Sequence, residues 1–217
     1  MQSFKALLIE QIDGKVSSGF VMLDPARLDP GAVTIRVAYS SVNYKDALAA
    51  TGVGKIIRRF PCVGGIDLSG TVIESADPRY KPGDPVIATS FDIGVAHHGG
   101  YAEIARVPGD WVVPLPAGLS LYDVMALGTA GFTAALAVVR LEENRLAAAN
   151  GPVIGSGATG GVGSLAVDIL ANRGYHVVAL TGKESATDYL KNLGAAEVML
   201  RNGLDLTKIR ALDNARW

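Results

Sequence analysis

The sequence contains little cysteine, little histidine and no excess of either charge. One cysteine and 3 histidines stand among 217 residues, and 20 basic side chains nearly balance 21 acidic ones. A single cysteine excludes an intrachain disulfide framework and favours a reducing, cytoplasmic setting. The net charge of −1 offers no basic excess that would attract nucleic acid or an acidic membrane surface. We therefore expect no nucleic-acid partner and no membrane partner.

Long apolar runs are also scarce. Lys5 precedes a short apolar run that ends at Glu10, which is not the pattern of a secretory signal. No uninterrupted apolar run approaches the roughly 20 residues that a membrane helix needs. Hydrophobic residues nevertheless make up 49% of the chain and charged residues 19%, a composition that predicts a packed core.

The scarcity of ligand residues argues against a metal centre. A zinc site takes about four ligands, drawn from cysteine, histidine and carboxylate side chains. The chain offers Cys62, His97, His98 and His176, and adjacent histidines in a loop tend to point apart. We expect no metal, solvated loop positions for His97 and His98, and a Cys62 that behaves as a small buried hydrophobe.

Turn residues and periodicity divide the chain into two halves. Up to residue 118, short β-rich runs alternate with Gly/Pro turns, a pattern typical of a β-barrel or sandwich. The expected strands are residues 6–9, 33–40, 70–74, 85–88, 102–107 and 111–114. From residue 119 helices alternate with strands, and Ser120 with Asp123 forms a helix-capping pattern. We predict an α/β chain of two domains, residues 1–118 and 119–217.

A strand, a glycine-rich turn and a helix follow one another in the second half. Residues 152–154 form a short strand, and residues 157–163 read GATGGVG. The apolar residues after this turn share one helix face: Val162, Leu165, Ala166, Ile169 and Leu170. Strands at 175–180 and 197–200, with a helix between them that Ser185 would cap, complete half of a dinucleotide-binding sheet. Backbone N–H groups at such a turn can approach a pyrophosphate; the alternative is a turn that only packs strand on helix.

The end of the second strand of this unit indicates which dinucleotide is bound. An NAD site places Asp or Glu there, about 20 residues beyond the glycines, to bind the ribose 2′-hydroxyl. This chain has Thr181, Lys183 and Ser185 instead, and a cation with hydroxyls suits a 2′-phosphate. We therefore favour NADP(H). The alternatives are an ordinary solvated Lys183 and a Ser185 that only caps a helix.

These motifs resemble the medium-chain dehydrogenase/reductase superfamily, in its zinc-independent, quinone-oxidoreductase-like branch, and within it the acrylyl-CoA reductase group. The resembling segments are SVNYKD at 41–46, PCVGGIDLSG at 61–70, GGYAE at 99–103, GTAGFTAA at 128–135, the glycine turn and TGKES at 181–185. The resemblance implies a GroES-like catalytic domain followed by a Rossmann domain. It also implies NADPH-dependent reduction of a 2-enoyl thioester, acrylyl-CoA to propanoyl-CoA, without zinc, and it suggests a homodimer.

The resemblance also supplies candidate site residues. Asn43 would orient substrate or cofactor through its amide, Tyr44 would stack on the nicotinamide or donate to a carbonyl, and Asp46 would serve as an orienting acceptor. The alternatives are a buried Tyr44 with a satisfied hydroxyl and an Asp46 that only caps a helix. Thr129 is expected at the cofactor, and Thr133 in helix packing. The full cofactor set is Thr129, Gly157, Thr159, Gly160, Gly161, Val162, Gly163, Thr181, Gly182, Lys183 and Ser185.

The sequence departs from the family pattern in two places. Gly155 and Ser156 stand where the family has bulkier strand residues, and a strand glycine weakens packing by about 1 kcal/mol. The chain also ends before the family's sheet would be complete, so we expect a C-terminally truncated chain with impaired activity. The competing hypotheses are a quinone or enal reductase, a non-catalytic nucleotide-binding protein, and a GroES-like module without a cofactor.

Overall fold

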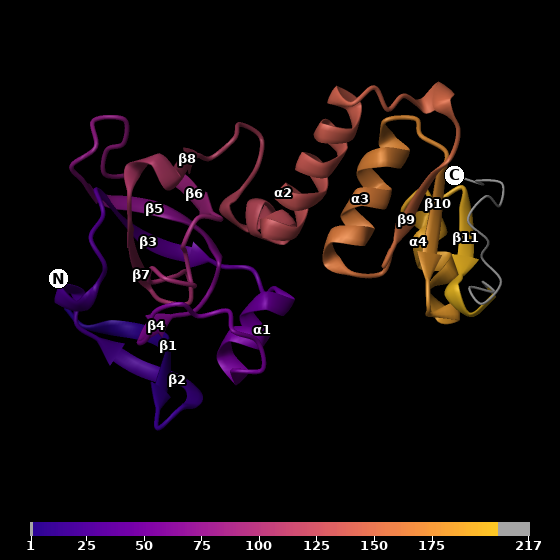
Figure 1. Cartoon of the computed structure of the whole chain (residues 1–217). Coiled ribbons are helices and arrows are strands. Elements are labelled where there is room, and N and C mark those ends of the chain that lie inside the picture. The colour runs from indigo at the N-terminus through magenta and orange to yellow at the C-terminus, as the bar shows by residue number, and fades with distance from the viewer. Residues whose placement is uncertain (1, 204–217) are drawn as a thin grey trace. The chain divides into compact units, whose positions relative to one another are not determined.

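The computed structural model describes residues 2–203, which fall into two compact units (Figure 1). The first unit ends at Thr129 and the second begins at Ala130. The predicted α/β class is confirmed, because strands dominate the first unit and strands alternate with helices in the second. The expected domain boundary after residue 118 stays a prediction. The last residues of the predicted second domain, 204–217, lie outside the described part of the chain.

The first unit is built on two antiparallel sheets. The smaller sheet has the order β2 (Lys15–Leu23), β1 (Phe4–Ile12) and β4 (Cys62–Val63). The larger sheet has the order β7 (Ile104–Val107), β3 (Val33–Tyr39), β5 (Asp67–Ser75), β6 (Pro85–Thr89) and β8 (Val112–Pro114). All six expected strands are present, whereas β2 and β4 were not expected. Asp13 and Gly14 join β1 to β2 with φ values of 51° and 77°, as a tight hairpin turn requires.

An aliphatic core fills the larger sheet. Val33 of β3 and Leu68 of β5 are completely buried in it. Trp111, in the short 3₁₀ helix before β8, packs against this core. Its ring stacks on Phe91 with centroids 5.2 Å apart and meets the ring of His97 edge-on at 5.1 Å. Trp111 therefore links this core to the rings of Phe91 and His97.

Two helices begin in the first unit. α1 (Tyr44–Thr51) follows β3, and α2 (Leu121–Glu143) is interrupted at Gly128, whose φ of 53° and ψ of −157° are not helical. The predicted cap of α2 is confirmed: Ser120 N donates to Asp123 Oδ2 at 2.9 Å, and Asp123 N donates to Ser120 Oγ at 3.1 Å. By length and composition alone α2 could cross a bilayer, a property that the core helices of water-soluble proteins share.

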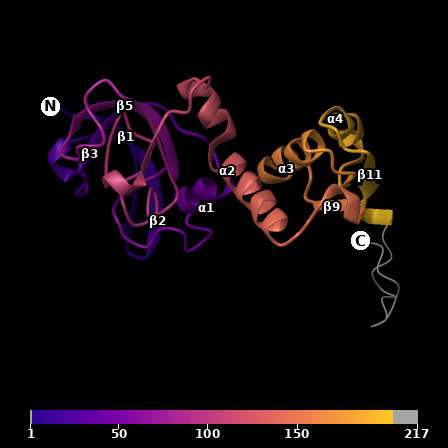
Figure 2. The ribbon, with the colours of Figure 1, turned by 90° about the horizontal axis from the view of Figure 1, so that it is seen from above.

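The second unit holds a parallel sheet with the order β11 (Glu197–Leu200), β10 (Val177–Thr181) and β9 (Val153–Ser156). α3 (Gly161–Asn172) and α4 (Thr187–Asn192) connect successive strands (Figure 2). The predicted alternation of strands and helices is therefore confirmed. Val167 and Leu170 of α3 are buried in the core, whereas Val162, expected on the inner face, is 43% exposed. It stands in the first turn of α3, beside the glycine turn rather than over the sheet.

Candidate functional site

The three residues predicted near the substrate stand at the N-terminus of α1. Asn43 precedes the helix, and its backbone N–H donates to Oδ2 of Asp46 at 2.8 Å. Asp46 therefore caps α1, which is the alternative role that the sequence analysis gave it. Tyr44 is 81% exposed, so the alternative of a buried Tyr44 is wrong. Whether the three contact a substrate stays a prediction.

Asp46 is a buried acid with one oxygen unsatisfied. Its residue is only 4% exposed, and within residues 2–203 its Oδ1 has no hydrogen-bond partner. Burial raises the pKa of the Asp46 carboxyl above its ordinary value, against the opposing hydrogen bonds from Asn43. Burial and the neighbouring Asp46 also raise the pKa of the Tyr101 hydroxyl, which donates to the carbonyl oxygen of Ser41 at 3.0 Å. This corner of the unit thus disfavours negative charge on either group.

Asp67, which no sequence pattern singled out as a site residue, lies beside this corner and is fully buried. Its Oδ1 accepts from Ser41 N at 2.8 Å, and its Oδ2 accepts from the Ser41 hydroxyl at 2.5 Å. The amide nitrogen of Asn43 lies 2.9 Å from Ser41 Oγ and 3.4 Å from Asp67 Oδ2. A buried carboxylate needs several hydrogen-bond donors. Those of Asp67 come from residues that are distant in the sequence, so tertiary structure brings them together.

Thr129 reaches the same carboxylate from the break in α2. Its backbone N–H and its hydroxyl donate to Asp67 Oδ2 at 2.9 and 2.7 Å, and its Oγ1 lies 2.9 Å from Thr89 Oγ1. Gly128 makes this approach feasible, because a Cβ there would lie 2.6 Å from Ser41 Oγ. Thr129 was predicted to contact the cofactor; the structure describes its bonds to Asp67, and its cofactor role stays a prediction.

His97 and His98 were expected to be solvated, and this expectation is wrong. Their exposed fractions are 9% and 5%. His98 Nδ1 accepts from Val63 N at 3.0 Å, and its Nε2 lies 3.2 Å from the carbonyl oxygen of Arg27. Burial lowers the pKa of His98, so the neutral ring with its proton on Nε2 fits both contacts. Their burial arises from tertiary packing, which adjacency in the sequence does not reveal.

Among residues 2–203, no group of three or more His, Cys, Asp and Glu side chains is arranged to hold a metal ion. Cys62 is fully buried, and burial raises the pKa of its thiol to about 12. The thiol is therefore protonated at neutral pH and is not a ready metal ligand. The expectation of a metal-free chain stays a prediction.

The glycine turn of the second unit leads from β9 into α3, as the sequence predicted. Gly157 has a φ of 64°, and its carbonyl oxygen accepts from Gly160 N at 2.9 Å. Thr159 lies within the turn, Gly160 is the N-cap of α3, and a Cβ at Gly163 would lie 2.3 Å from the oxygen of Gly157. Glycine is therefore required at 163 for the turn to close tightly on the helix.

A cavity of about 400 Å³ opens at this turn. At the turn it is lined by Gly157, Gly160, Gly161, Val162 and Gly163. The rest of its lining runs between α3 and the sheet and is mostly apolar: Gly155, Ser156, Ala166, Val167, Leu170 and Val177. The exposed N-terminal turn of α3 directs its backbone N–H groups and its positive dipole end to this region. The residues present therefore fit a pyrophosphate, although binding itself stays a prediction.

The end of β10 carries the predicted phosphate loop. Thr181 is 3% exposed and its Oγ1 accepts from Lys183 N at 3.0 Å, so the hydroxyl shapes the loop. Lys183 and Gly182 are exposed. Arg201, which follows β11 and was not among the predicted residues, places its guanidinium beside Gly182: a Cβ there would lie 3.4 Å from Nη2. Two cations thus stand at the end of the strand where an NAD site would place an acid.

Ser185 does not cap a helix. It lies exposed within the 3₁₀ turn Glu184–Ala186, and α4 begins only at Thr187. The expected cap was therefore wrong, because the chain makes one tight turn before the helix starts. The Ser185 hydroxyl stands in the same exposed loop as Lys183.

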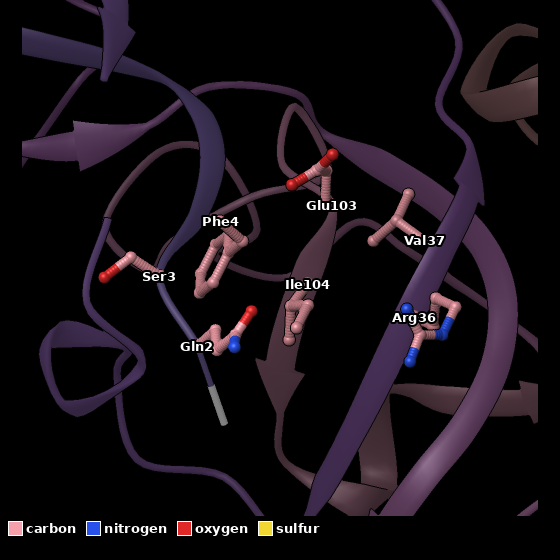
Figure 3. A pocket seen from close by; sticks show the side chains of 7 residues that line it. All are labelled: Gln2, Ser3, Phe4, Arg36, Val37, Glu103 and Ile104. Carbon is pink, nitrogen blue, oxygen red and sulfur yellow. The ribbon is translucent and has the colours of Figure 1, made fainter. Parts of the chain in front are cut away.

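A different cavity, of about 490 Å³, lies in the first unit where β1 begins beside β3 and β7 (Figure 3). It is lined by Gln2, Ser3, Phe4, Arg36, Val37, Glu103 and Ile104. None of these is a predicted site residue. Glu103 already accepts from the backbone N–H of Lys5 at 2.8 Å, so part of its charge is compensated within the protein. This cavity is separate from the Asp67 cluster.

Comparisons with known proteins agree with both units. The model of the alcohol dehydrogenase GroES-like domain matches residues 29–117. The probable acrylyl-CoA reductase AcuI of Escherichia coli is 49% identical over 213 residues, which cover 98% of this chain and 65% of that protein. The chain therefore spans about two thirds of the length of this curated relative.

Solved structures extend the likeness to the fold. The yhdH oxidoreductase of Salmonella enterica, in complex with NADP, matches with a TM-score of 0.93 and 49% identity over 98% of this chain and 65% of that one. The yhfP protein of Bacillus subtilis, with NAD bound, matches with a TM-score of 0.95 and 50% identity over 100% of this chain and 66% of that one. The chain belongs to the medium-chain dehydrogenase/reductase superfamily.

Proposed function

We propose that this chain binds NADP(H) and belongs to a zinc-free reductase of 2-enoyl thioesters that converts acrylyl-CoA to propanoyl-CoA. The observation that carries the cofactor is the pair of cations, Lys183 and Arg201, beside Gly182 at the end of β10. The substrate class rests on the likeness to AcuI, of which the chain spans 65%. The glycine turn supports the dinucleotide in general and does not separate the two phosphorylation states.

The chemistry divides between cofactor and protein. A bound NADPH supplies a hydride to the β-carbon of the enoyl thioester. A donor beside the thioester oxygen would stabilise the negative charge of the transition state, and the α-carbon would take up a proton to complete the reduction. Tyr44, exposed at the start of α1, can donate its hydroxyl or stack its ring, and Asn43 can orient a ligand through its amide. Asp46, whose carboxyl pKa is raised by burial, serves as the capping acceptor of α1.

Cofactor selection is tested by binding. Lys183→Ala and Arg201→Ala each remove one cation from the loop, and loss of a charged hydrogen bond costs about 1.5–3 kcal/mol, or roughly 10-fold and more in the NADPH dissociation constant. NADH affinity should stay nearly unchanged, because NADH lacks the 2′-phosphate. Lys191→Ala, on α4, is the matched control. An equal loss of NADPH and NADH affinity in the two loop variants would contradict the proposed selectivity.

Activity is tested by following NADPH consumption with acrylyl-CoA, with quinones and with simple enals. Preferential reduction of acrylyl-CoA is the expected result, and turnover of quinones or enals alone would replace the proposed substrate. The resemblance also suggests a homodimer, and sedimentation of this chain measures it directly.

The second candidate is a nucleotide-binding protein without reductase activity. The glycine turn and the two cations beside Gly182 support it as well as they support the reductase, because both candidates require a bound dinucleotide. NADPH binding without turnover of any of these substrates would support this candidate. A third possibility, a GroES-like module without a cofactor, predicts that NADPH gives no protection against thermal unfolding.

A further inference from the structure

The carboxylate of Asp67 gathers residues that are distant in the sequence. From residues 2–203 it accepts five hydrogen bonds, donated by Ser41 N and Oγ, Asn43 Nδ2, and Thr129 N and Oγ1. Ser41 and Asn43 precede α1, whereas Thr129 lies at the break in α2. Asn43 and Thr129 are two of the residues predicted to contact ligands. One fully buried carboxylate thus connects both of them.

The protons of this cluster fix the orientation of the Asn43 amide. A serine hydroxyl has one proton, and the 2.5 Å contact assigns that of Ser41 to Asp67 Oδ2. Ser41 Oγ can then only accept at its 2.9 Å contact with Asn43, so the amide group there must be the nitrogen. A flipped amide would place its oxygen against two oxygens that offer it no proton.

The 3.4 Å contact between Asn43 Nδ2 and Asp67 Oδ2 adds to this preference. Ser41 Oγ and Asp67 Oδ2 lie next to each other, so both attract the same edge of the amide. The negative charge of Asp67 favours the nitrogen edge and repels the oxygen edge. The Ser41 hydroxyl and the charge of Asp67 therefore favour this orientation together, beside the capping-box contact of the Asn43 side chain with the first turn of α1.

We propose that Asp67 is a positioning residue of the candidate site, which holds the Asn43 amide in one orientation and ties Asn43 and Thr129 to a common point. It acts through these residues, which donate to its carboxylate. The inference rests on the proposed function for its catalytic consequence, but its structural part is independent of any activity.

The structural part is tested by nuclear magnetic resonance of the ¹⁵N-labelled chain. The side-chain NH₂ signals of Asn43 are assigned by their loss in Asn43→Ser. In Asp67→Asn the amide loses its charged acceptor, and we expect exchange of these protons with solvent to quicken about tenfold or more. Unchanged exchange of the Asn43 protons in Asp67→Asn would overturn the proposal.

The matched control is Asp29→Asn. Asp29 is a carboxylate of the same unit that pairs with Arg59 and accepts from His98 N at 2.6 Å. Removing its charge should leave Asn43 exchange unchanged; faster exchange in this variant to the same degree would make the effect a general loosening and contradict the proposal. If Asp67→Asn does not fold, Ser41→Ala keeps the carboxylate but removes the bridging hydroxyl. It should also quicken Asn43 exchange, and unchanged exchange there would again overturn the proposal.

The catalytic part is tested by a double-mutant cycle on kcat/KM. Because Asp67 acts through Asn43 and also holds Thr129, Asp67→Asn combined with Asn43→Ala should lose less kcat/KM than the product of the two single losses. Multiplied losses would mean independent effects and would contradict the positioning role. If the unsubstituted chain does not reduce acrylyl-CoA, the proposed function fails, while proton exchange still decides the role of Asp67.

Discussion

A Cβ atom on Gly128 would lie 2.6 Å from the hydroxyl oxygen of Ser41 and 2.9 Å from its Cβ. The φ of 53° and ψ of −157° at Gly128 belong to a region that essentially only glycine occupies. Backbone conformation and space therefore both exclude a side chain at this point. The break in α2 and the Asp67 cluster depend on the same residue.

Gly128→Ala should lower the free energy of unfolding by more than about 1–3 kcal/mol, because backbone strain and a clash with Ser41 add. Urea unfolding followed by circular dichroism measures the loss. The matched control is Gly118→Ala, whose φ is 86° but whose Cβ would meet nothing within 4 Å. It should cost only the strain, about 1–2 kcal/mol. Equal losses in the two variants would show that the clash with Ser41 contributes nothing.

Asp46→Asn should leave stability at neutral pH within about 0.5 kcal/mol of the unsubstituted chain, or increase it. The amide oxygen can still accept from Asn43 N, and the substitution removes a carboxylate that burial disfavours. Asp46→Ala removes the cap and should cost about 1 kcal/mol or more. Thermal unfolding of the two variants in parallel measures both losses of stability. A larger loss in Asp46→Asn than in Asp46→Ala would contradict the prediction.

The chain should lose stability as the pH falls below the ordinary histidine pKa of 6.5, because burial lowers the pKa of His98 in the folded state. In that range the unfolded chain binds a proton that the folded chain rejects, so the contribution of His98 is present above pH 6.5 and declines below it. Urea unfolding between about pH 7 and about pH 5.5 measures the decline.

His98→Gln should flatten that pH dependence. Its side-chain oxygen can accept from Val63 N and its amide nitrogen can donate to the oxygen of Arg27, as the neutral ring does. His176→Gln is the control, because His176 is an exposed residue of the second unit. A pH dependence that persists in His98→Gln and disappears in His176→Gln would assign the effect to the wrong histidine.

Cys62 should react slowly with iodoacetamide in the folded chain at about pH 8, because the thiolate is the reactive form. Its pKa is raised to about 12 and its exposed fraction is zero. Mass spectrometry reports a single site, since the sequence has one cysteine. The urea-unfolded chain provides the rate of an accessible thiol. Equal rates in the folded and unfolded chain would contradict the burial of Cys62.

The second unit could be predicted from sequence more fully than the first. The glycine turn, the helix after it and the strand at 197–200 are local patterns, and local patterns set the alternation of strand and helix. In the first unit β2 was missed, although Asp13-Gly14 is a hairpin signal between two strands. Its mostly exposed residues show no clean apolar alternation that would have completed the pattern.

The residues that matter most to the candidate sites were beyond local patterns. Asp67 looks like one acid in a strand until Ser41 and Thr129, 26 and 62 positions away in the sequence, are seen to donate to it. Arg201 becomes relevant only because β10 and β11 pair in parallel and bring it beside Gly182. Both the Asp67 cluster and the position of Arg201 arise from contacts between residues that are distant in the sequence. Spacing along the chain does not predict such contacts.

The stacked pair of Trp111 and Phe91 has a practical consequence for following this chain in solution. The sequence has two tryptophans, and residues 130–203 contain neither. In a Trp217→Phe variant, all tryptophan emission would come from Trp111, against the core of the first unit. Fluorescence would then report the melting of that unit, while circular dichroism reports both. Comparing the two signals would show whether the units melt together or in sequence.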